Sequence, residues 1–259
     1  MEWRDVLYAK NDGVARITIN RPQAYNAFTT DTLREIARAL ADAELDPDVG
    51  VVVLTGAGDK AFCTGGDTGE AAQKGGYAKD NLYWHAEVHR RIRNIPKPVI
   101  AAVNGYAIGG GHILHLICDL SIASENAKFG QAGPRVGSFD AGFGVTYLAR
   151  VVGEKKAREI WFLCRQYTAQ EALEMGLVNK VAPKEMLERE VNEWCQEILS
   201  LSPTALKFCK LSFNAETDHM FGFDALSEAA VRLFWGTAEA EEAKTAFKEK
   251  RKPDFSAFK

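Results

Sequence analysis

The sequence has little of what marks a disulfide-rich or membrane-bound protein. Its five cysteines, at positions 63, 118, 164, 195 and 209, form no close pair and have no metal-ligand spacing. Scattered cysteines with apolar neighbours indicate reduced core thiols and a cytoplasmic location. No apolar run approaches the roughly 20 residues that a membrane-spanning helix needs. The charged start Met1–Asp5 lacks a signal-peptide pattern, so we expect neither a leader nor a membrane partner.

Charge of one sign is not in excess either. The net charge is −3, with 26% charged and 46% hydrophobic residues, which is ordinary for a soluble globular protein. This balance gives no argument for nucleic acid as a partner. The 259 residues suffice for one or two domains with a sizeable core, and they contain no internal repeat or low-complexity tract.

Glycine is concentrated where a chain reversal is expected. The segment Gly105-Tyr-Ala-Ile-Gly-Gly-Gly-His112 lies between the apolar runs 98–103 and 113–118. This order predicts a buried strand, a bare-backbone turn and a buried helix. The first amides of a helix lack partners within it, and with the helix dipole they can bind a negative oxygen. Tight packing of the strand against the helix would explain the same glycines, so this turn alone is a weak signal.

A second turn of the same kind lies upstream. The β-branched run 51–56 leads into Asp59-Lys-Ala-Phe-Cys-Thr-Gly-Gly-Asp67. Two such turns, each after a strand, can bring two N–H donors to one point, which is the geometry of an oxyanion hole. The sequence therefore predicts a site whose central chemistry comes from the backbone.

The remaining pattern predicts an α/β fold with a parallel sheet. Strands are expected at 6–8 and 14–19, joined by a turn at 11–13, and again at 51–54 and 120–123, with a helix over 30–45. Strand–helix–strand order favours parallel pairing. We divide the chain into a core domain, residues 1–200, and a helical C-terminal subdomain, residues 201–259. From Gly153 onward, helices are expected over 154–165, 168–175, 184–200, 203–213 and 222–249.

Two segments beside the turns have no regular pattern of their own. Residues 68–82 are polar and contain glycine, and we interpret them as a mobile loop that orders over the site with substrate; a surface loop without function is the alternative. Residues 83–95 are expected to form a helix. Its charged and histidine side chains are interpreted as a solvated face, and they are His85, His89, Arg90, Arg91 and Arg93.

Taken in order, these motifs resemble the crotonase (enoyl-CoA hydratase/isomerase) superfamily over nearly the whole chain. The matching segments are Ile19-Asn-Arg-Pro22, Asn26-Ala27, Ala61–Asp67, Gly105–Gly111, Cys118-Asp-Leu120, Ala127–Gln131, Gly153 with Ala157, and Ala172–Val178. The resemblance implies a crotonase fold: two roughly perpendicular β-sheets surrounded by helices, with a helical C-terminal region that assembles homotrimers or homohexamers. It also implies an acyl-CoA substrate held at its thioester oxygen.

The resemblance places the two oxyanion N–H groups on Gly66 and Gly110. Hydratases of this superfamily use two glutamates as acid and base. The corresponding positions here are Ile113 and Gly133, and neither side chain can transfer a proton. Simple hydration of an enoyl-CoA is therefore not expected.

Ser138 and Asp140, in a glycine-bounded segment, are the candidates for proton transfer. The pattern alone favours a helix-capping aspartate and a serine that bonds its own backbone. However, Val136-Gly-Ser-Phe-Asp140, Leu148–Trp161, Cys164–Tyr167 and Lys250–Phe255 are similar to one branch of the superfamily. That branch contains 2-ketocyclohexanecarboxyl-CoA hydrolase and 1,4-dihydroxy-2-naphthoyl-CoA synthase, and the resemblance favours catalytic roles for both residues.

Three functions stay open at this point. Our first choice is hydrolytic opening of a cyclic β-ketoacyl-CoA ring, and the second is ring closure by a naphthoyl-CoA synthase. The synthase pattern is broken at Thr68–Ala71, at Ala132 and at Trp235, although Tyr77 fits a synthase loop tyrosine. The third is an acyl-CoA-binding member that is not catalytic.

The resemblance also implies contacts with substrate and coenzyme A, which arrives as part of the substrate. No tightly bound cofactor and no metal are expected, but synthases with glycine at the Gly133 position use a bicarbonate near Gln131. The basic end of the chain, Lys248–Pro253, is expected to contact coenzyme A phosphates across a subunit boundary, or is simply a charged tail. The predicted contact residues are Tyr25, Ala27, Thr64, Gly65, Asp67, Thr68, Tyr77, Tyr106, Gln131, Gly133, Trp235 and Lys250.

Overall fold

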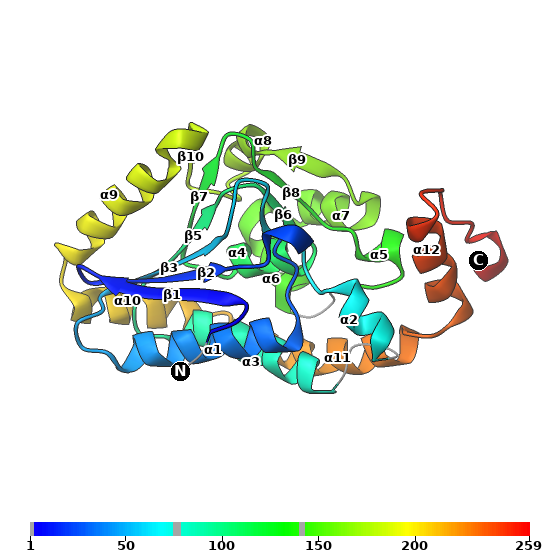
Figure 1. Ribbon diagram of the computed structural model, residues 1–259, viewed down its shortest axis with the longest axis horizontal. Coiled ribbons are helices and arrows are strands. Elements are labelled where there is room, and N and C mark those ends of the chain that lie inside the picture. The colour runs from blue at the N-terminus through cyan, green and yellow to red at the C-terminus, as the bar shows by residue number, and fades with distance from the viewer. Residues whose placement is uncertain (1–2, 75–78, 140–142) are drawn as a thin grey trace.

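The computed structural model describes residues 3–74, 79–139 and 143–259, which form two β-sheets surrounded by helices (Figure 1). The six-stranded sheet has the order β1-β2-β3-β5-β7-β10, and the four-stranded sheet has the order β4-β6-β8-β9. The strands are β1 Val6–Asn11, β2 Val14–Ile19, β3 Val51–Gly56, β4 Ala61–Cys63, β5 Val99–Val103, β6 Tyr106–Ile108, β7 Leu120–Ser124, β8 Lys128–Gly130, β9 Gln166–Thr168 and β10 Lys180–Ala182.

Helices pack on both sheets and extend the chain beyond them. They are α1 Thr30–Leu45, α2 Thr68–Gln73, α3 Lys79–Asn94, α4 Gly110–Leu116, α5 Gly133–Val136, α6 Phe143–Val152, α7 Glu154–Leu163, α8 Ala169–Glu174, α9 Leu187–Leu199, α10 Pro203–Ala215, α11 Gly222–Phe234 and α12 Ala238–Lys248. Short 3-10 helices are η1 Pro22–Ala24, η2 Lys184–Met186, η3 Asp218–Phe221 and η4 Ser256–Phe258. In the described ranges no helix has both the length and the apolar character that crossing a bilayer requires.

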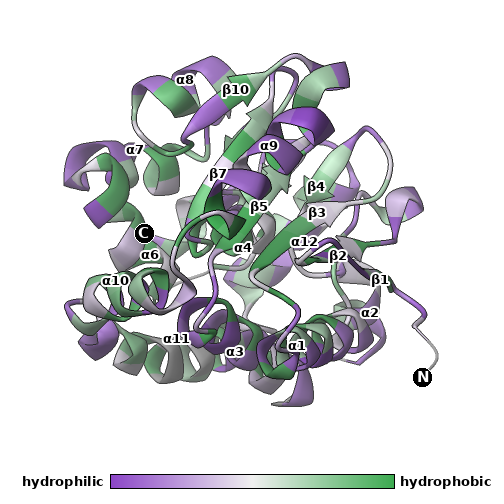
Figure 2. Ribbon diagram, turned by 90° about the vertical axis from the view of Figure 1, so that its left-hand side faces the viewer, coloured by the Kyte–Doolittle hydropathy of each residue, from purple (hydrophilic) through white to green (hydrophobic). Residues whose placement is uncertain are grey.

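The large sheet is parallel from β2 to β10, and β1 adds to its edge as a hairpin. The hairpin turn has Asp12 and Gly13 at φ 49° and 81°, the left-handed region that this pair tolerates well. Along β3, Val51 and Val53 pack against α9, while Val52 and Leu54 belong to the main core on the other face. Because helices and core residues cover both faces of the sheet, the side chains on both sides of such a strand are apolar. This explains the continuous apolar runs of the sequence. Figure 2 shows these strands as a hydrophobic centre inside more polar helices.

The parallel sheet and the hairpin confirm the sequence-based prediction, and α1 confirms the helix over 30–45. Thr29 caps α1 by accepting from Thr32 N, with a reciprocal bond from Thr29 N to Thr32 Oγ1. The predicted helix over 222–249 is wrong in extent, because the chain breaks between α11 and α12. Gly236 takes φ 85° there, and Thr237 caps the new helix through Ala240 N.

Three further expectations need correction. The segment 68–82 is not one loop, since Asp67 caps α2 and α3 begins at Lys79. The glycine-rich turn contains a short strand, β6, that joins the second sheet. The face of α3 that we expected to be solvated buries His89 and Arg93, each 3% exposed. There the Arg93 guanidinium lies 4.9 Å from the ring centroids of both Phe143 and Tyr147.

The C-terminal helices attach to the core through polar contacts as well as apolar ones. Lys210 on α10 is buried and donates to Asp119 Oδ2 (2.6 Å) and to Ile92 O (2.9 Å). Ser202 caps α10, and Pro203 is its first residue, which agrees with the start of the predicted helix over 203–213. Helix α12 lies at one end of the molecule beside α5 (Figure 1). The boundary at residue 200 remains a prediction.

Candidate active site

The two glycine turns meet at one edge of the small sheet. Strands β4 and β6 are parallel neighbours, so the turns that follow them lie side by side. A Cβ on Gly65 would lie 3.0 Å from Gly110 N, and one on Gly111 would overlap the carbonyl of Cys63. Only glycine permits this approach of backbone to backbone. The glycines therefore do more than pack a strand against a helix: they bring two exposed stretches of backbone together.

The N–H groups of Gly66 and Gly110 have no hydrogen-bond acceptor among residues 3–74, 79–139 and 143–259. Gly110 is the first residue of α4, where no acceptor within the helix exists. Phe28 fixes the turn that contains Gly66, because Phe28 N donates to Gly65 O (2.8 Å) and Asp67 N donates to Phe28 O (2.9 Å). The hydrogen bonds that hold the first turn in place do not involve the N–H group of Gly66, and the N–H group of Gly110 also stays unused. Two adjacent donors are therefore able to bind an oxyanion.

Asp67 holds the first turn in place. Its carboxylate accepts from Gly69 N (2.8 Å) and Glu70 N (3.0 Å) and pairs with Arg21 (2.8 Å). Partial burial raises the pKa of this carboxyl, but the hydrogen bonds from Glu70 and Arg21 outweigh burial and leave the pKa below its usual value. The geometry gives Asp67 a supporting role, and its predicted substrate contact stays a prediction.

The two positions that the resemblance aligns with the hydratase glutamates, Ile113 and Gly133, are closely packed. Ile113 is 1% exposed, and a Cβ on Gly144 of α6 would overlap its side chain. A Cβ on Gly133 would lie 2.8 Å from Phe139 Cα and 2.9 Å from Ser138 O. A side chain at Gly133 would therefore have to displace Ser138 and Phe139. Asp140 lies outside the described residues, as does Tyr77.

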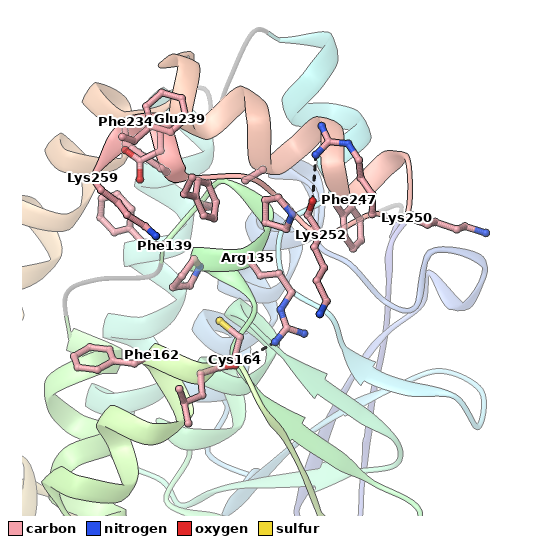
Figure 3. Close-up of a pocket in the computed structure, with 18 residues that line it drawn as sticks. Arg135, Phe139, Phe162, Cys164, Phe234, Glu239, Phe247, Lys250, Lys252 and Lys259 are labelled. Carbon is pink, nitrogen blue, oxygen red and sulfur yellow. Dashed lines mark hydrogen bonds between the residues drawn. The ribbon is translucent and has the colours of Figure 1, made fainter.

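Ser138 lines a cavity of about 1120 Å³ between α5, the end of α7, α12 and the C-terminal tail (Figure 3). Its wall combines phenylalanine rings with basic side chains. Arg135 and Lys250 belong to this wall, and Arg135 donates to Leu163 O (3.1 Å). Trp235 lies at the end of α11, with Lys244 Nζ 3.4 Å from its ring centroid. The predicted contact Lys250 and the predicted relay Ser138 thus share one cavity.

Gln131 and Trp161 each have a buried polar atom without a partner in the described part of the chain. These atoms are Gln131 Oε1 and Trp161 Nε1. Gln131 Nε2 donates to Gly109 O (3.4 Å), which ties this side chain to the second glycine turn. A buried polar group without a partner is costly, so both atoms suit contact with a ligand or water.

Four of the predicted contact residues gather beside the first turn. The rings of Tyr25 and Tyr106 are exposed and lie 6.4 Å apart, edge to face. Thr64 Oγ1 donates to Tyr25 O (3.2 Å), and Ala27 is buried next to them. Thr68 is exposed at the start of α2. The structure therefore brings Tyr25, Ala27, Thr64 and Tyr106 together, whereas Lys250 and Trp235 belong to the C-terminal side.

Sequence reasoning missed His85. Its ring centroid lies 5.5 Å from that of Phe28, whose ring end lies 2.8 Å from the position of a Cβ on Gly110. The available signal was the spacing of His85, Val88, His89 and Ile92, which is typical of a buried helix face. We gave the polar character of the histidines more weight than this spacing.

Comparison with known proteins agrees with the geometry. The model of the enoyl-CoA hydratase/isomerase family matches residues 9–257. An enoyl-CoA hydratase from Mycobacterium avium subsp. paratuberculosis is 32% identical, with 98% of this chain and 99% of that chain covered and a TM-score of 0.84. An enoyl-CoA hydratase/isomerase from Xanthobacter autotrophicus is 34% identical (96% and 93% covered, TM-score 0.82). One from Pseudoalteromonas atlantica is 27% identical (98% and 100% covered, TM-score 0.87).

These three names refer to hydratase and isomerase chemistry, and none refers to ring opening or ring closure. They support the superfamily without selecting the branch that the sequence motifs favour. The match of the family model over nearly the whole length, with the shared fold, settles the broader assignment. The chain belongs to the enoyl-CoA hydratase/isomerase (crotonase) family of acyl-CoA enzymes.

Proposed function

We propose that this protein opens the ring of a cyclic β-ketoacyl-CoA by hydrolysis, through a thioester enolate. One observation carries the proposal. The N–H groups of Gly66 and Gly110 lie close together and have no acceptor in the described part of the chain, and the positions that the resemblance aligns with the hydratase glutamates are Ile113 and Gly133. This arrangement supports stabilisation of an enolate by an enzyme that does not use the acid–base pair of hydratases.

Ring opening needs a base that is not one of those glutamates. Asp140 would take a proton from water, and the resulting hydroxide would add to the ketone carbon of the ring. The bond between that carbon and the α-carbon then breaks, and its electron pair forms the thioester enolate. Asp140, with Ser138 as relay, returns the proton to the α-carbon, and the new carboxylic acid ionises. Support for Asp140 comes from the sequence motif Val136-Gly-Ser-Phe-Asp140, in which the preceding residues Ser138 and Phe139 lie against Gly133.

The enolate oxygen would bind to both backbone donors. Loss of one such donor typically costs roughly 2.7–4 kcal/mol of transition-state stabilisation. Tyr25, Ala27, Thr64 and Tyr106 lie beside the first turn and would contact the coenzyme A portion of the substrate. Lys250, in the basic wall of the cavity that Ser138 lines, would meet a phosphate.

A second candidate is ring closure of o-succinylbenzoyl-CoA by a naphthoyl-CoA synthase. The observation that favours it is the pair of unpartnered buried atoms, Gln131 Oε1 and Trp161 Nε1. In synthases with glycine at the Gly133 position, a bicarbonate near these positions acts as the base. An indole N–H donor without a partner suits an anion oxygen. Ala132 and Trp235 depart from the synthase pattern, which is why ring closure ranks second.

Mass spectrometry after separate incubations with 2-ketocyclohexanecarboxyl-CoA and o-succinylbenzoyl-CoA tests the proposal. We expect the first substrate to gain one water and the second to be unchanged, with turnover independent of added bicarbonate. Loss of one water from the second substrate, with a bicarbonate requirement, would establish the synthase instead. Tight binding of both esters without turnover would leave only a binding protein.

The Asp140→Asn variant tests the base. It keeps the size of the side chain and removes the basic oxygen, so we expect ring opening to fall by roughly 10²-fold or more. Arg158→Gln, on the exposed side of α7, is the control and should keep normal turnover. Full activity of Asp140→Asn would remove Asp140 from the mechanism.

A further inference from the structure

The N–H group of Gly110 belongs to a peptide group whose carbonyl end is held by two hydrogen bonds. That carbonyl is Gly109 O, and it accepts from Ile113 N (3.1 Å) within α4 and from the side-chain amide of Gln131 through Nε2 (3.4 Å). The peptide is trans, so its C=O and its N–H point in opposite directions. The bonds that fix Gly109 O therefore also fix the direction of the Gly110 N–H.

The end of β8 holds Gly109 on both sides. Gly109 N donates to Gly130 O (3.0 Å), and the next residue, Gln131, donates to Gly109 O. This contact follows from the parallel pairing of β6 with β8, in which Ile108 lies opposite Gly130. Gly109 has φ 57° and ψ −125°, a conformation that suits glycine and is strained for other residues. Such a conformation persists where the surrounding groups hold it, and the end of β8 supplies this support.

The other donor of the site has a similar arrangement. The N–H of Gly66 belongs to the peptide group whose carbonyl is Gly65 O, and this oxygen accepts from Phe28 N (2.8 Å). Both donor peptides are thus held at their carbonyl ends, and both N–H groups are left without an acceptor in the described part of the chain. The difference is that Gly109 O has a second partner, which comes from a side chain and can be changed by mutation.

Neither packing nor hydrogen-bond pairing explains why this side chain is an amide. Gln131 is 2% exposed, and its Oε1 has no partner in the described residues. A buried acceptor without a partner destabilises the folded protein. Gly109 O already has Ile113 N as a partner, so an apolar side chain at position 131 would leave that carbonyl paired. The explanation for the amide must therefore lie in its effect on the peptide group that it contacts.

A hydrogen bond to a carbonyl polarises the whole peptide group and makes the N–H at its other end a stronger donor. Linked hydrogen bonds strengthen one another in this way by roughly 10–30%. An oxyanion donor also has to be in its final orientation before charge develops on the substrate. The bond from Gln131 serves both requirements for the N–H of Gly110.

We infer that Gln131 is a positioning residue of the oxyanion site. Its side-chain N–H holds and polarises the peptide group between Gly109 and Gly110, which strengthens the hydrogen bond from Gly110 N to the thioester oxygen. No proton moves through Gln131, and it does not have to touch the reacting atoms for this role. The inference rests on the proposed binding of the thioester oxygen by Gly110, and it is independent of the ring that the substrate carries.

Infrared spectroscopy of a bound thioester measures the strength of the donors directly. Cyclohexanecarboxyl-CoA, isotopically labelled at its thioester carbonyl, lacks the ring ketone and cannot be opened. Binding to the wild type should lower its C=O stretching frequency, because hydrogen bonds weaken the carbonyl bond. Gln131→Met keeps the length of the side chain and removes the N–H, so the bound ester should show a smaller shift. Gln196→Met, at an exposed glutamine on α9, is the matched control and should give the wild-type shift.

Kinetics and unfolding separate this role from a purely structural one. Loss of a partner that orients a metal ligand typically costs roughly 10–100-fold in activity, and by analogy we expect a fall of this size in kcat for ring opening by Gln131→Met, with KM nearly unchanged. Stability in urea should stay at or above the wild-type value, because the buried acceptor without a partner is gone. Gln131→Leu is a second apolar variant and should behave in the same way.

The outcomes distinguish this inference from the proposed function. If the wild type does not shift the C=O frequency, the oxyanion site is wrong, and the proposed function fails together with the role of Gln131. If the wild type shifts it and both Gln131 variants shift it equally, only the role of Gln131 is wrong. Lower stability with an unchanged C=O frequency would show that Gln131 serves the fold alone, which would also overturn the inference.

Discussion

At the scale of single residues, glycines shape the candidate site because they allow segments of backbone to approach one another closely. Gly65, Gly110 and Gly111 let two turns touch, and Gly133 lets the segment after α5 fold back on it. A methyl group at these points would meet backbone or a buried ring. The site is thus defined as much by absent side chains as by the carboxylate and hydroxyl assigned to Asp140 and Ser138.

Gly110→Ala should therefore abolish most activity without unfolding the protein. Its Cβ would lie 2.8 Å from the Phe28 ring, so either that ring or the Gly110 amide must move. We expect kcat/KM to fall by roughly 10²–10³-fold, the usual effect of losing one oxyanion donor. Gly222→Ala is the matched control, since no atom lies within 4 Å of its Cβ position. Near-normal kcat/KM in Gly110→Ala would speak against a donor role for its N–H.

The carboxylate of Asp67 should make stability depend on acid pH. Its pKa is lowered in the folded protein, whereas an unfolded aspartate has a pKa of about 3.9. Its contribution is therefore fully present above that pH and is lost as the pH falls through the folded-state pKa. Asp67→Asn keeps an N-cap side chain but loses the pair with Arg21, so we expect about 1 kcal/mol lower stability at pH 7. Urea unfolding of both proteins at pH 7 and pH 3 checks this. A stability difference between wild type and Asp67→Asn that is as large at pH 3 as at pH 7 would contradict it.

At the scale of elements, the packing of α12 on α5 supports the segment that contains Ser138. Gly137 ends α5 at φ 72°, and a Cβ there would overlap Ala240 O of α12. The position of Ser138 and the cavity that it lines therefore depend on one glycine between two helices.

Gly137→Ala should lower stability and activity more than Gly153→Ala, which introduces backbone strain alone. Gly153 has a similar φ of 80° but no atom within 4 Å of its Cβ position. Both variants lose about 1 kcal/mol from the left-handed backbone, and Gly137→Ala must in addition displace α12. Gly137→Ala should therefore show the larger loss of unfolding free energy in denaturant and the larger decrease in ring-opening activity. Equal losses in both would show that α12 does not constrain the segment.

The strands and the glycine turns could be predicted from sequence because their signals are local. The valine run at 51–54 and the Asn-Asp-Gly turn at 11–13 each restrict the backbone on their own. The burial of His89 and Arg93 could not be predicted, because it depends on Phe143, Tyr147 and Thr217, which are distant in sequence. Likewise, the break before α12 follows from the docking of that helix on α5. The roles of Asp140 and Tyr77 remain predictions because those residues lie outside the described part of the chain.

At the scale of the whole molecule, the C-terminal helices present apolar side chains to the outside. Phe208 and Phe213 on α10 and Leu226 and Leu233 on α11 are exposed by 59%, 80%, 65% and 80%. Exposed apolar faces of this kind usually mark an interface between proteins. They agree with the assembly into homotrimers or homohexamers that the family resemblance implies, which remains a prediction.

Sedimentation of the wild type should accordingly give a trimer or a hexamer. Phe213→Glu combined with Leu233→Glu places two charges in the expected interface and should shift the protein to smaller species. Leu45→Glu is the control, because Leu45 is 83% exposed at the end of α1 and is not part of α10 or α11, and its variant should assemble normally. A monomeric wild type would contradict the prediction.

The central claim is a thioester enolate that takes a proton after the ring has opened, and ring opening in D₂O tests it most directly. The product from 2-ketocyclohexanecarboxyl-CoA should remain a coenzyme A ester, gain one water, and contain deuterium at the carbon next to the thioester, as mass spectrometry and NMR can establish. Free coenzyme A with an intact ring would mean attack at the thioester, and it would contradict the claim.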